Sequence, residues 1–268
     1  MEAFLKNNES FLELSKWQQR SSELIVGFTT RNGGASKNVF SSFNCGLHVY
    51  DEKTDVLNNR NKLAGLVDMP LSTWIAGEQV HDTQVMLVNR KDSGSGSASM
   101  ETALKGIDGI LTKETGVLLT AFFADCIPLY FFDPVDKIIG IAHAGWKGTV
   151  GGIANEMVLA FKKQGSKLEN ILVAIGPGIS QKHYEVDMRV YNAIDGRYRE
   201  KVLVPIEKNR FLLDLKKLNN EMLLQSGILR HNIDVTNFCT YEDEALFYSY
   251  RRDQGKTGRM LGFIGFRE

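Results

Sequence analysis

The sequence has no excess of either charge, because 32 Lys and Arg residues are balanced by 32 Asp and Glu residues in a chain of 268. A protein without a net charge cannot attract nucleic acid or an anionic membrane through its overall field. We therefore expect no nucleic-acid partner, and any anionic ligand must be held by a local site. The 43% of hydrophobic residues is nevertheless typical of a folded protein with a substantial core.

Long apolar segments are also lacking. The most apolar stretch, 116–132, is interrupted by Thr120, Asp125 and Pro128, and it is shorter than the ~20 apolar residues that a membrane-spanning helix needs. The first twenty residues contain neither an apolar core nor a small-residue cleavage site, as an export signal would. These absences predict a cytoplasmic protein without a membrane partner.

Cysteine is scarce and widely spaced, at Cys45, Cys126 and Cys239. An odd number of distant cysteines in a chain of this size does not predict a disulfide framework. Glycine-rich phosphate-binding motifs are absent from the expected junctions between strands and helices, which argues against a dinucleotide-binding or P-loop protein. No repeat with a period of 20 to 50 residues occurs either.

The hydrophobic pattern predicts strands and helices that do not alternate regularly, which favours an α+β fold over a doubly wound sheet. One domain spanning 1–268 is expected, with the Ser- and Gly-rich segment 91–102 as a mobile surface loop. We expect two aromatic-rich strands in the tail, around a charged loop. The other predicted strands are 23–30, two short ones within 73–88, 116–123, 137–144 and 169–180, and the predicted helices are 55–67, 149–165 and 211–227.

Two potential metal ligands each follow an apolar strand: Cys126 in ADCIPLYFFDP and His143 in IAHAGWKG. Together with His81 in QVHDTQV they form a thiolate and two imidazoles, a ligand set that suits zinc and leaves a fourth position open for catalysis. The residues alone leave other interpretations open. Cys126 could be a small buried hydrophobe, His81 could be a turn residue, and Cys126 with His143 could be a nucleophile and its base.

Seven segments follow one another in a specific order: FTTRNGGASKNVFSSFNCGLHVYD, GEQVHDTQV, IDGILT, FADCIPLYFFD, IAHAGWKGTVGGI, IGPGISQKHYEVD and FYSYRRDQGKTGRMLGFI. Together they resemble the YfiH family of laccase-domain proteins, once labelled multicopper polyphenol oxidases, and especially its bacterial YlmD branch. The resemblance runs from about Phe28 to Glu268. It implies a single-domain mixed α/β fold with a β-sandwich-like core flanked by helices, and a zinc ion held by His81, Cys126 and His143.

The resemblance also implies an activity, a purine nucleoside phosphorylase that uses inorganic phosphate and has adenosine deaminase activity. Its implied substrates are adenosine, inosine, guanosine and S-methyl-5′-thioadenosine. The chain departs from the family in QKHYEVD, where His183 replaces one thiol of a cysteine pair that many members carry. This departure leaves the three zinc ligands untouched.

Several residues are candidates for binding the substrate or for assisting the reaction. Arg31 and Asn44 lie in segments that match the family, and Arg31 could form an anion site with the backbone of RNGG. Arg251 and Arg252 are the corresponding candidates in the tail. Asp125, next to Cys126, could orient a ligand or protonate the base. The chain is expected to act as a monomer or homodimer.

Three other functions stay open at the level of sequence. A multicopper oxidase needs clustered histidines, but the five histidines of this chain include no closely spaced pair; a single Cu2+ could still occupy the zinc site. A Cys-His hydrolase or amidase acting on peptidoglycan precursors would use Cys126 as its nucleophile. A binding protein would show no turnover. The combined signature of zinc-dependent base deaminases, H-x-E with P-C-x-x-C, is missing because no P-C-x-x-C occurs, so any deamination must use another scaffold.

Overall fold

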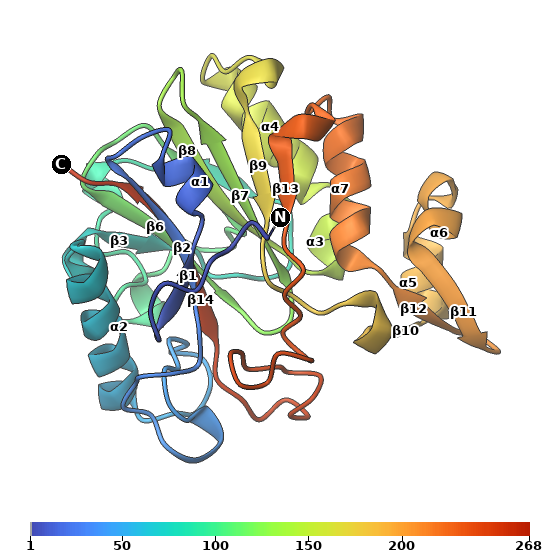
Figure 1. The fold of residues 1–268 in the computed structure, drawn as a ribbon, viewed down its shortest axis with the longest axis horizontal. Helices are drawn as coiled ribbons and strands as arrows, with labels where there is room; N and C mark the ends of the chain where they lie inside the picture. Colours follow the sequence, from blue (N-terminus) through green and yellow to red (C-terminus); the bar gives the residue numbers. More distant parts are fainter. Residues whose placement is uncertain (1) are drawn as a thin grey trace.

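Two large β-sheets pack face to face in the computed structural model, which describes residues 2–268 (Figure 1). Most neighbouring strands in these two sheets are antiparallel, and three pairs are parallel. The five-stranded sheet has the order β1 (Phe11–Glu13), β2 (Leu24–Thr29), β14 (Met260–Phe266), β6 (Val117–Phe123) and β3 (Trp74–Ala76). The six-stranded sheet has the order β13 (Ile233–Val235), β9 (Leu172–Ile175), β7 (Ile127–Asp133), β8 (Ile138–Ala144), β5 (Gly109–Thr112) and β4 (Val85–Leu87).

Helices cover the outer faces of both sheets, giving four layers (Figure 1). Helix α2 (Lys53–Val67) packs on the five-stranded sheet, and α4 (Ile153–Lys163) and α7 (Leu215–Gln225) pack on the six-stranded one. The short helices are α1 (Ser15–Gln18) and α3 (Trp146–Gly151). A small arm projects beside α7 and consists of β10 (Glu185–Asp187), α5 (Met188–Ala193), α6 (Gly196–Val202), β11 (Leu203–Glu207) and β12 (Arg210–Leu213).

The central strands are apolar at almost every position because both of their faces are buried. In β7, Leu129 and Phe131 pack toward α4 and α7, whereas Tyr130 and Phe132 pack between the two sheets. Successive side chains of a strand point to opposite faces, so a strand between two hydrophobic layers needs apolar residues throughout. The two sheets and their covering helices confirm the predicted α+β fold with a sandwich-like core.

Most predicted elements are present, including the two short strands on either side of His81. The helix predicted at 149–165 is divided into α3 and α4 at Gly152, whose φ of +97° lies in the left-handed region that glycine tolerates. The first predicted strand of the tail is wrong, since 245–250 consists of turns and irregular backbone. Phe247 and Tyr248 are buried and Tyr250 is exposed, and the carbonyl of Phe247 accepts a hydrogen bond from Arg252 rather than from a neighbouring strand.

The Ser- and Gly-rich loop folds back on the protein. It contains short turns at Arg90–Asp92 and Met100–Thr102. Its centre is held by the buried Arg60, whose Nη1 donates to the carbonyls of Gly96 (2.8 Å) and Ser97 (2.6 Å). The loop is therefore anchored at its middle as well as at its ends. Among the described residues, no helix combines the length and the apolar character needed to cross a bilayer.

Candidate metal centre

Three side chains from distant parts of the sequence converge at one end of the sandwich. His81 lies in the turn between β3 and β4, Cys126 directly precedes β7, and His143 lies near the end of β8. Their ligand atoms all lie within 4.8 Å of one another, and Sγ of Cys126 is 3.8 Å from Nε2 of His81. Ligands of one tetrahedral zinc ion lie about 3.5 Å apart, so small side-chain adjustments suffice for the three to share an ion.

The alternation of β8 directs His143 into the site. Ile139 and Ile141 face the layer between the two sheets, and His143 follows with the same parity and is only 3% exposed. Gly145 then lets the chain pass close to the other two ligands. A Cβ atom at Gly145 would lie 2.7 Å from Cδ2 of His81 and 3.0 Å from Sγ of Cys126. A larger residue there would occupy the space that the ligand side chains need.

Asp108, which sequence reasoning did not single out, connects two of the ligands. Its carboxylate accepts hydrogen bonds from the backbone amides of Val80 (3.0 Å), His81 (3.1 Å) and Asp82 (2.9 Å). It also lies 2.8 Å from Nδ1 of His143. This contact leaves Nε2 of His143 available to a metal. The only hint in the sequence was the position of Asp108 in the segment IDGILT.

The protonation of the ligands reflects their mutual contact. Burial alone would raise the pKa of the Cys126 thiol, but His143 and His81 lower it to about 6. Burial would lower the pKa of His143, but Cys126 and Asp108 raise it to about 9. Without a metal, the pair is thus a thiolate and an imidazolium at neutral pH. A pre-formed thiolate suits metal binding because the thiolate is the form of cysteine that coordinates.

The cluster opens onto a cavity of about 690 Å³. Its walls combine aromatic, cationic and acidic side chains, which is the composition expected of a site for a polar organic ligand. Besides His81, Cys126 and His143, the lining residues are His48, Gly77, Glu78, Gln79, Val80, Met100, Phe122, Ala124, Asp125, Ile179, Tyr184, Leu215, Tyr250, Arg251 and Arg259.

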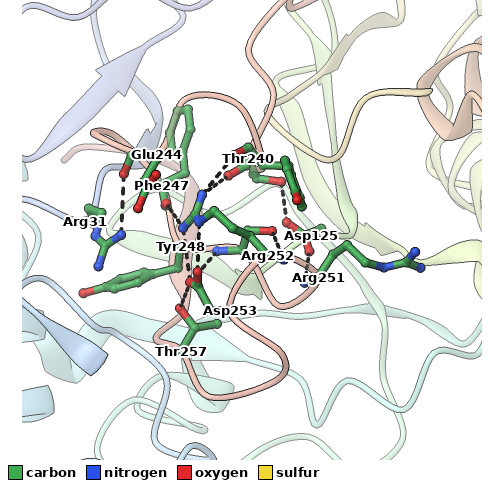
Figure 2. Close-up of polar contacts among 12 residues, drawn as sticks. Arg31, Asp125, Thr240, Glu244, Phe247, Tyr248, Arg251, Arg252, Asp253 and Thr257 are labelled. Carbon is green, nitrogen blue, oxygen red and sulfur yellow. Dashed lines mark hydrogen bonds and ion pairs between the residues drawn. The ribbon is translucent and has the colours of Figure 1, made fainter. Parts of the chain in front are cut away.

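Asp125 lines the cavity, but its carboxylate already accepts hydrogen bonds from the C-terminal loop, residues 236–259 between β13 and β14 (Figure 2). One oxygen accepts a 2.6 Å hydrogen bond from the hydroxyl of Thr240, and the other accepts a 2.8 Å bond from the backbone amide of Arg251. Asp125 thereby fixes the position of residues 240–251 beside the metal ligands. Its geometry is that of a positioning residue.

The neighbouring arginines of the tail have different environments. Arg252 points into the loop, where it donates to the carbonyls of Thr240, Tyr241 and Phe247 and pairs with the carboxylate of Asp253 (Figure 2). Arg251 extends in another direction and lines the cavity. Arg251 therefore lies at the site, whereas Arg252 stabilises the loop through its hydrogen bonds.

Arg31, Asn44 and His183 are not among the residues that line the cavity. Arg31 donates to the carbonyls of Ser41 and Glu244 and stacks on Tyr248. The buried Asn44 accepts hydrogen bonds from the backbone amides of Gly46 and Arg259. His183 stacks on Tyr241 and lies 3.0 Å from the carboxylate of Glu242. Asn44 therefore reaches the site only through the backbone of Arg259.

Two cavity residues that the sequence did not reveal are Arg259 and Tyr184. Arg259 lies in the matching tail segment, but nothing in its local pattern separates it from a solvated charge. The pKa of His48 is lowered to about 4, by partial burial first and then by Arg259 and Arg60. The pKa of Tyr184 is raised, chiefly by burial and then by the charge of Cys126, so its phenol stays protonated. The cavity thus combines a cationic side with a neutral hydrogen-bond donor.

A family model and individual relatives both place this chain among the same group of known proteins. Residues 25–267 match the family model described as multi-copper polyphenol oxidoreductase laccase. Purine nucleoside phosphorylase YlmD of Bacillus subtilis is 45% identical over 99% of this chain and 98% of its own length. The YlmD protein of the same description from Geobacillus stearothermophilus is 45% identical over 91% of this chain and 90% of its own.

Solved structures agree with these sequence relationships. The hypothetical protein YfiH of Bacillus licheniformis matches with a TM-score of 0.96 at 40% identity, and YlmD of Geobacillus stearothermophilus matches with 0.94 at 41% identity. A more distant protein of Neisseria meningitidis, NMB0706, matches with 0.80 at 27% identity. Each alignment covers both chains completely.

Proposed function

Because this chain belongs to the multi-copper polyphenol oxidoreductase laccase family and is 45% identical to a protein named purine nucleoside phosphorylase, we propose that it is a zinc-dependent purine nucleoside phosphorylase. The proposed reaction splits a purine nucleoside with inorganic phosphate into the free base and ribose 1-phosphate. The substrates are adenosine, inosine, guanosine and S-methyl-5′-thioadenosine.

One observation carries this proposal: the converging ligands His81, Cys126 and His143 open onto a cavity that also contains two arginines. A nucleoside and a phosphate ion are both polar, and one is anionic. A volume of about 690 Å³ lies within the usual range of small-molecule sites. The site therefore offers room for both reactants beside one metal position.

The donor set fits zinc. One thiolate and two imidazoles are borderline to soft ligands, and three protein ligands leave a coordination position for a reactant. When bound, such an ion supplies a Lewis acid that polarises a coordinated oxygen and can generate hydroxide from water at neutral pH. The last property would also serve the hydrolytic deamination of adenosine, which we include as a second proposed activity of the same site.

The protein side chains have separate tasks in this proposal. Tyr250 and Phe122 offer aromatic surfaces against which a base or ribose can pack. The protonated phenol of Tyr184 donates a hydrogen bond to the substrate. Asp108 orients His143, and Asp125 keeps Arg251 at the cavity wall. These contacts hold both reactants in place for an in-line displacement.

A copper oxidase finds less support, although the family description names copper. Among the residues the structure describes, the only close group of three potential ligands contains two histidines and one cysteine. A trinuclear copper cluster needs many more. A single copper ion in the zinc position is an outcome that metal analysis would reveal.

The test combines metal analysis with product analysis. The purified protein would be assayed for bound zinc and copper, and then incubated with adenosine with and without phosphate. We expect bound zinc and phosphate-dependent release of adenine and ribose 1-phosphate, with inosine as the product of deamination. His81→Ala and His143→Ala should abolish base release. Activity that survives complete removal of zinc, or base release that ignores phosphate, would contradict the proposal.

A further inference from the structure

Two arginines at the cavity wall have no carboxylate partner. Within residues 2–268, no carboxylate oxygen lies within 4 Å of a guanidinium nitrogen of Arg251 or Arg259, whereas Arg252 is paired with Asp253. Both unpaired arginines line the cavity that contains the metal ligands. Arg251 is exposed, whereas Arg259 is half-buried. A guanidinium group that is partly removed from water without a counter-ion is costly, so the environment of Arg259 favours an anionic ligand.

Hydrogen bonds and an aromatic contact fix the position of Arg259. Its backbone amide donates to Oδ1 of Asn44 (2.8 Å), and its Nη1 donates to the carbonyls of Thr257 (2.9 Å) and Gly258 (3.0 Å). Its guanidinium stacks on Tyr250 at 5.6 Å. The remaining guanidinium nitrogens have no hydrogen-bond acceptor among the described residues. They are free to donate to a ligand in the cavity.

Arg251 is fixed in a similar way. Its Nη1 donates to the carbonyl of Glu185 (3.0 Å), and its guanidinium stacks on Tyr184 at 5.4 Å. Its backbone amide is held by Asp125. Each arginine thus has one hydrogen-bonded edge and one aromatic neighbour, which limits the rotamer freedom that ligand binding would otherwise remove.

The acidic residues of the cavity, Asp125 and Glu78, form no direct ion pair with these two arginines. The two carboxylate oxygens of Asp125 are occupied by Thr240 and by the backbone of Arg251. The carboxylate of Glu78 lies 3.7 Å from the ammonium group of Lys105. Arg251 and Arg259 therefore lie at the cavity wall without a carboxylate in direct contact with their guanidinium groups.

We propose that Arg251 and Arg259 bind the inorganic phosphate co-substrate from this side of the cavity. The inference rests on the proposed phosphorylase function and assigns one reactant to named residues. Guanidinium groups suit this role, since each can donate two parallel hydrogen bonds to a tetrahedral oxyanion. Asn44 acts as a positioning residue because it holds the backbone of Arg259.

The reaction balances with phosphate held in this way. An oxygen of hydrogen phosphate forms a bond to C1′ of the ribose, and the bond between C1′ and the base nitrogen breaks. The electron pair of that bond leaves with the base, which takes up the proton that the phosphate gives up. Two fixed cations on the phosphate keep the nucleophile aligned as the glycosidic bond opens.

The test measures phosphate binding separately from nucleoside binding. In the zinc-loaded full-length protein, Arg251→Gln and Arg259→Gln should each raise the KM for phosphate by about 10- to 100-fold, the effect of losing a charge-assisted hydrogen-bonding partner. The KM for the nucleoside should change by less than about threefold. Calorimetric titration with inorganic phosphate should show the same loss of affinity without any turnover. Arg259→Lys keeps the charge and should recover part of the binding.

The controls separate local effects from general ones. Arg230 is an exposed arginine that does not line the cavity, and Arg230→Gln should leave phosphate binding unchanged. Zinc content and thermal stability identify variants whose loop has been disturbed. Adenosine 5′-monophosphate serves as a second probe. If the arginines held the 5′-phosphate of a nucleotide, the variants would weaken its binding and leave the dependence on inorganic phosphate intact, which would overturn the inference.

The inference and the proposed function can fail independently. Phosphate-dependent base release that stays normal in both arginine variants would overturn the inference and leave the phosphorylase function standing. Binding of phosphate that is lost in the variants, in a protein that releases no base, would support the anion site and refute the phosphorylase. A wild-type protein that does not bind phosphate would overturn the inference directly.

Discussion

The carboxylate of Asp108 lies 2.8 Å from Nδ1 of His143 and accepts hydrogen bonds from the backbone amides of three successive residues, including His81. One side chain thereby fixes the ring of one candidate metal ligand, His143, and the backbone of another, His81. Burial raises the pKa of Asp108, but its hydrogen bonds to His143 and to the amides of Asp82 and Val80 outweigh this effect and keep it ionised. Such outer partners set the tautomer and orientation of a ligating histidine.

The first prediction concerns Asp108→Asn. An amide can accept fewer of the four hydrogen bonds, and its NH2 group would face donors. We expect zinc affinity to fall by about 10- to 100-fold, as for other changes to residues that orient metal ligands. A chelator competition titration measures the affinity directly. The d–d absorption of a cobalt-substituted sample should also change if His143 has rotated.

A matched control is available in Asp133, a fully buried aspartate at the end of β7. Its carboxylate accepts the backbone amides of Val135 and Asp136 but does not line the cavity. Asp133→Asn should lower the free energy of unfolding by about 1–3 kcal/mol without changing zinc affinity. Equal losses of zinc affinity in both variants would show that Asp108 acts only through general stability.

The sequence identified the three converging side chains, His81, Cys126 and His143, better than it identified the residues of the cavity around them. Cys126 and His143 follow apolar strands, and the segments that contain them carry a specific resemblance, so the three ligands could be named. Arg259 and Asp108 could not be identified in this way. Their roles depend on contacts with residues far away in the sequence, as in the bond from Arg259 to Asn44, and local periodicity contains no such information.

In the tail, by contrast, the sequence predicted an element that is not present. Residues 245–250 have the aromatic composition of a strand, and the middle of this segment, residues 247–249, is indeed buried. The backbone forms no strand, and Arg252 and Asp253 bond to the carbonyl of Phe247 and the amide of Ser249, groups that would bond to a neighbouring strand in a sheet. A burial pattern predicts which side chains are inside, but it does not predict which groups satisfy the backbone.

The second prediction concerns Gly145→Ala. The new Cβ would stand 2.7 Å from the ring of His81 and 3.0 Å from the sulfur of Cys126, closer than van der Waals contact allows. Because His81 is exposed, its ring can move away, and the expected result is a loss of zinc affinity of at least 10-fold with little change in unfolding free energy. Zinc content after dialysis and chemical denaturation of the metal-free protein measure the two quantities.

Gly65 provides the control for this change. It lies inside α2, and a Cβ there would meet nothing within 4 Å. Gly65→Ala should stabilise the protein by up to about 1 kcal/mol through helix propensity and leave zinc binding as it is. If Gly145→Ala binds zinc normally, the close approach of the three segments is not a requirement of the site.

The last prediction uses the acid–base pairing of Cys126 with His143 in the metal-free protein. The pKa of Cys126 is depressed to about 6 and that of His143 is raised to about 9. The depressed thiol contributes stability above its unfolded pKa and loses it as the pH falls through about 6. The raised imidazole contributes stability below its unfolded pKa and loses it as the pH rises through about 9. The ion pair is therefore complete between these values.

Alkylation with iodoacetamide reports the thiolate of Cys126, since only the thiolate reacts. In metal-free protein the rate should rise with a midpoint near pH 6, and in His143→Ala the midpoint should move toward the ordinary thiol value of 9.0, because the main stabilising charge is gone. Cys45 is an internal control: it is buried, and burial raises its pKa to about 12, so it should remain unmodified. Added zinc should protect Cys126 in the wild type. A midpoint near 9 in the unaltered protein would mean that His143 does not share its charge with the thiol, and the geometry proposed for the metal ligands would then be wrong.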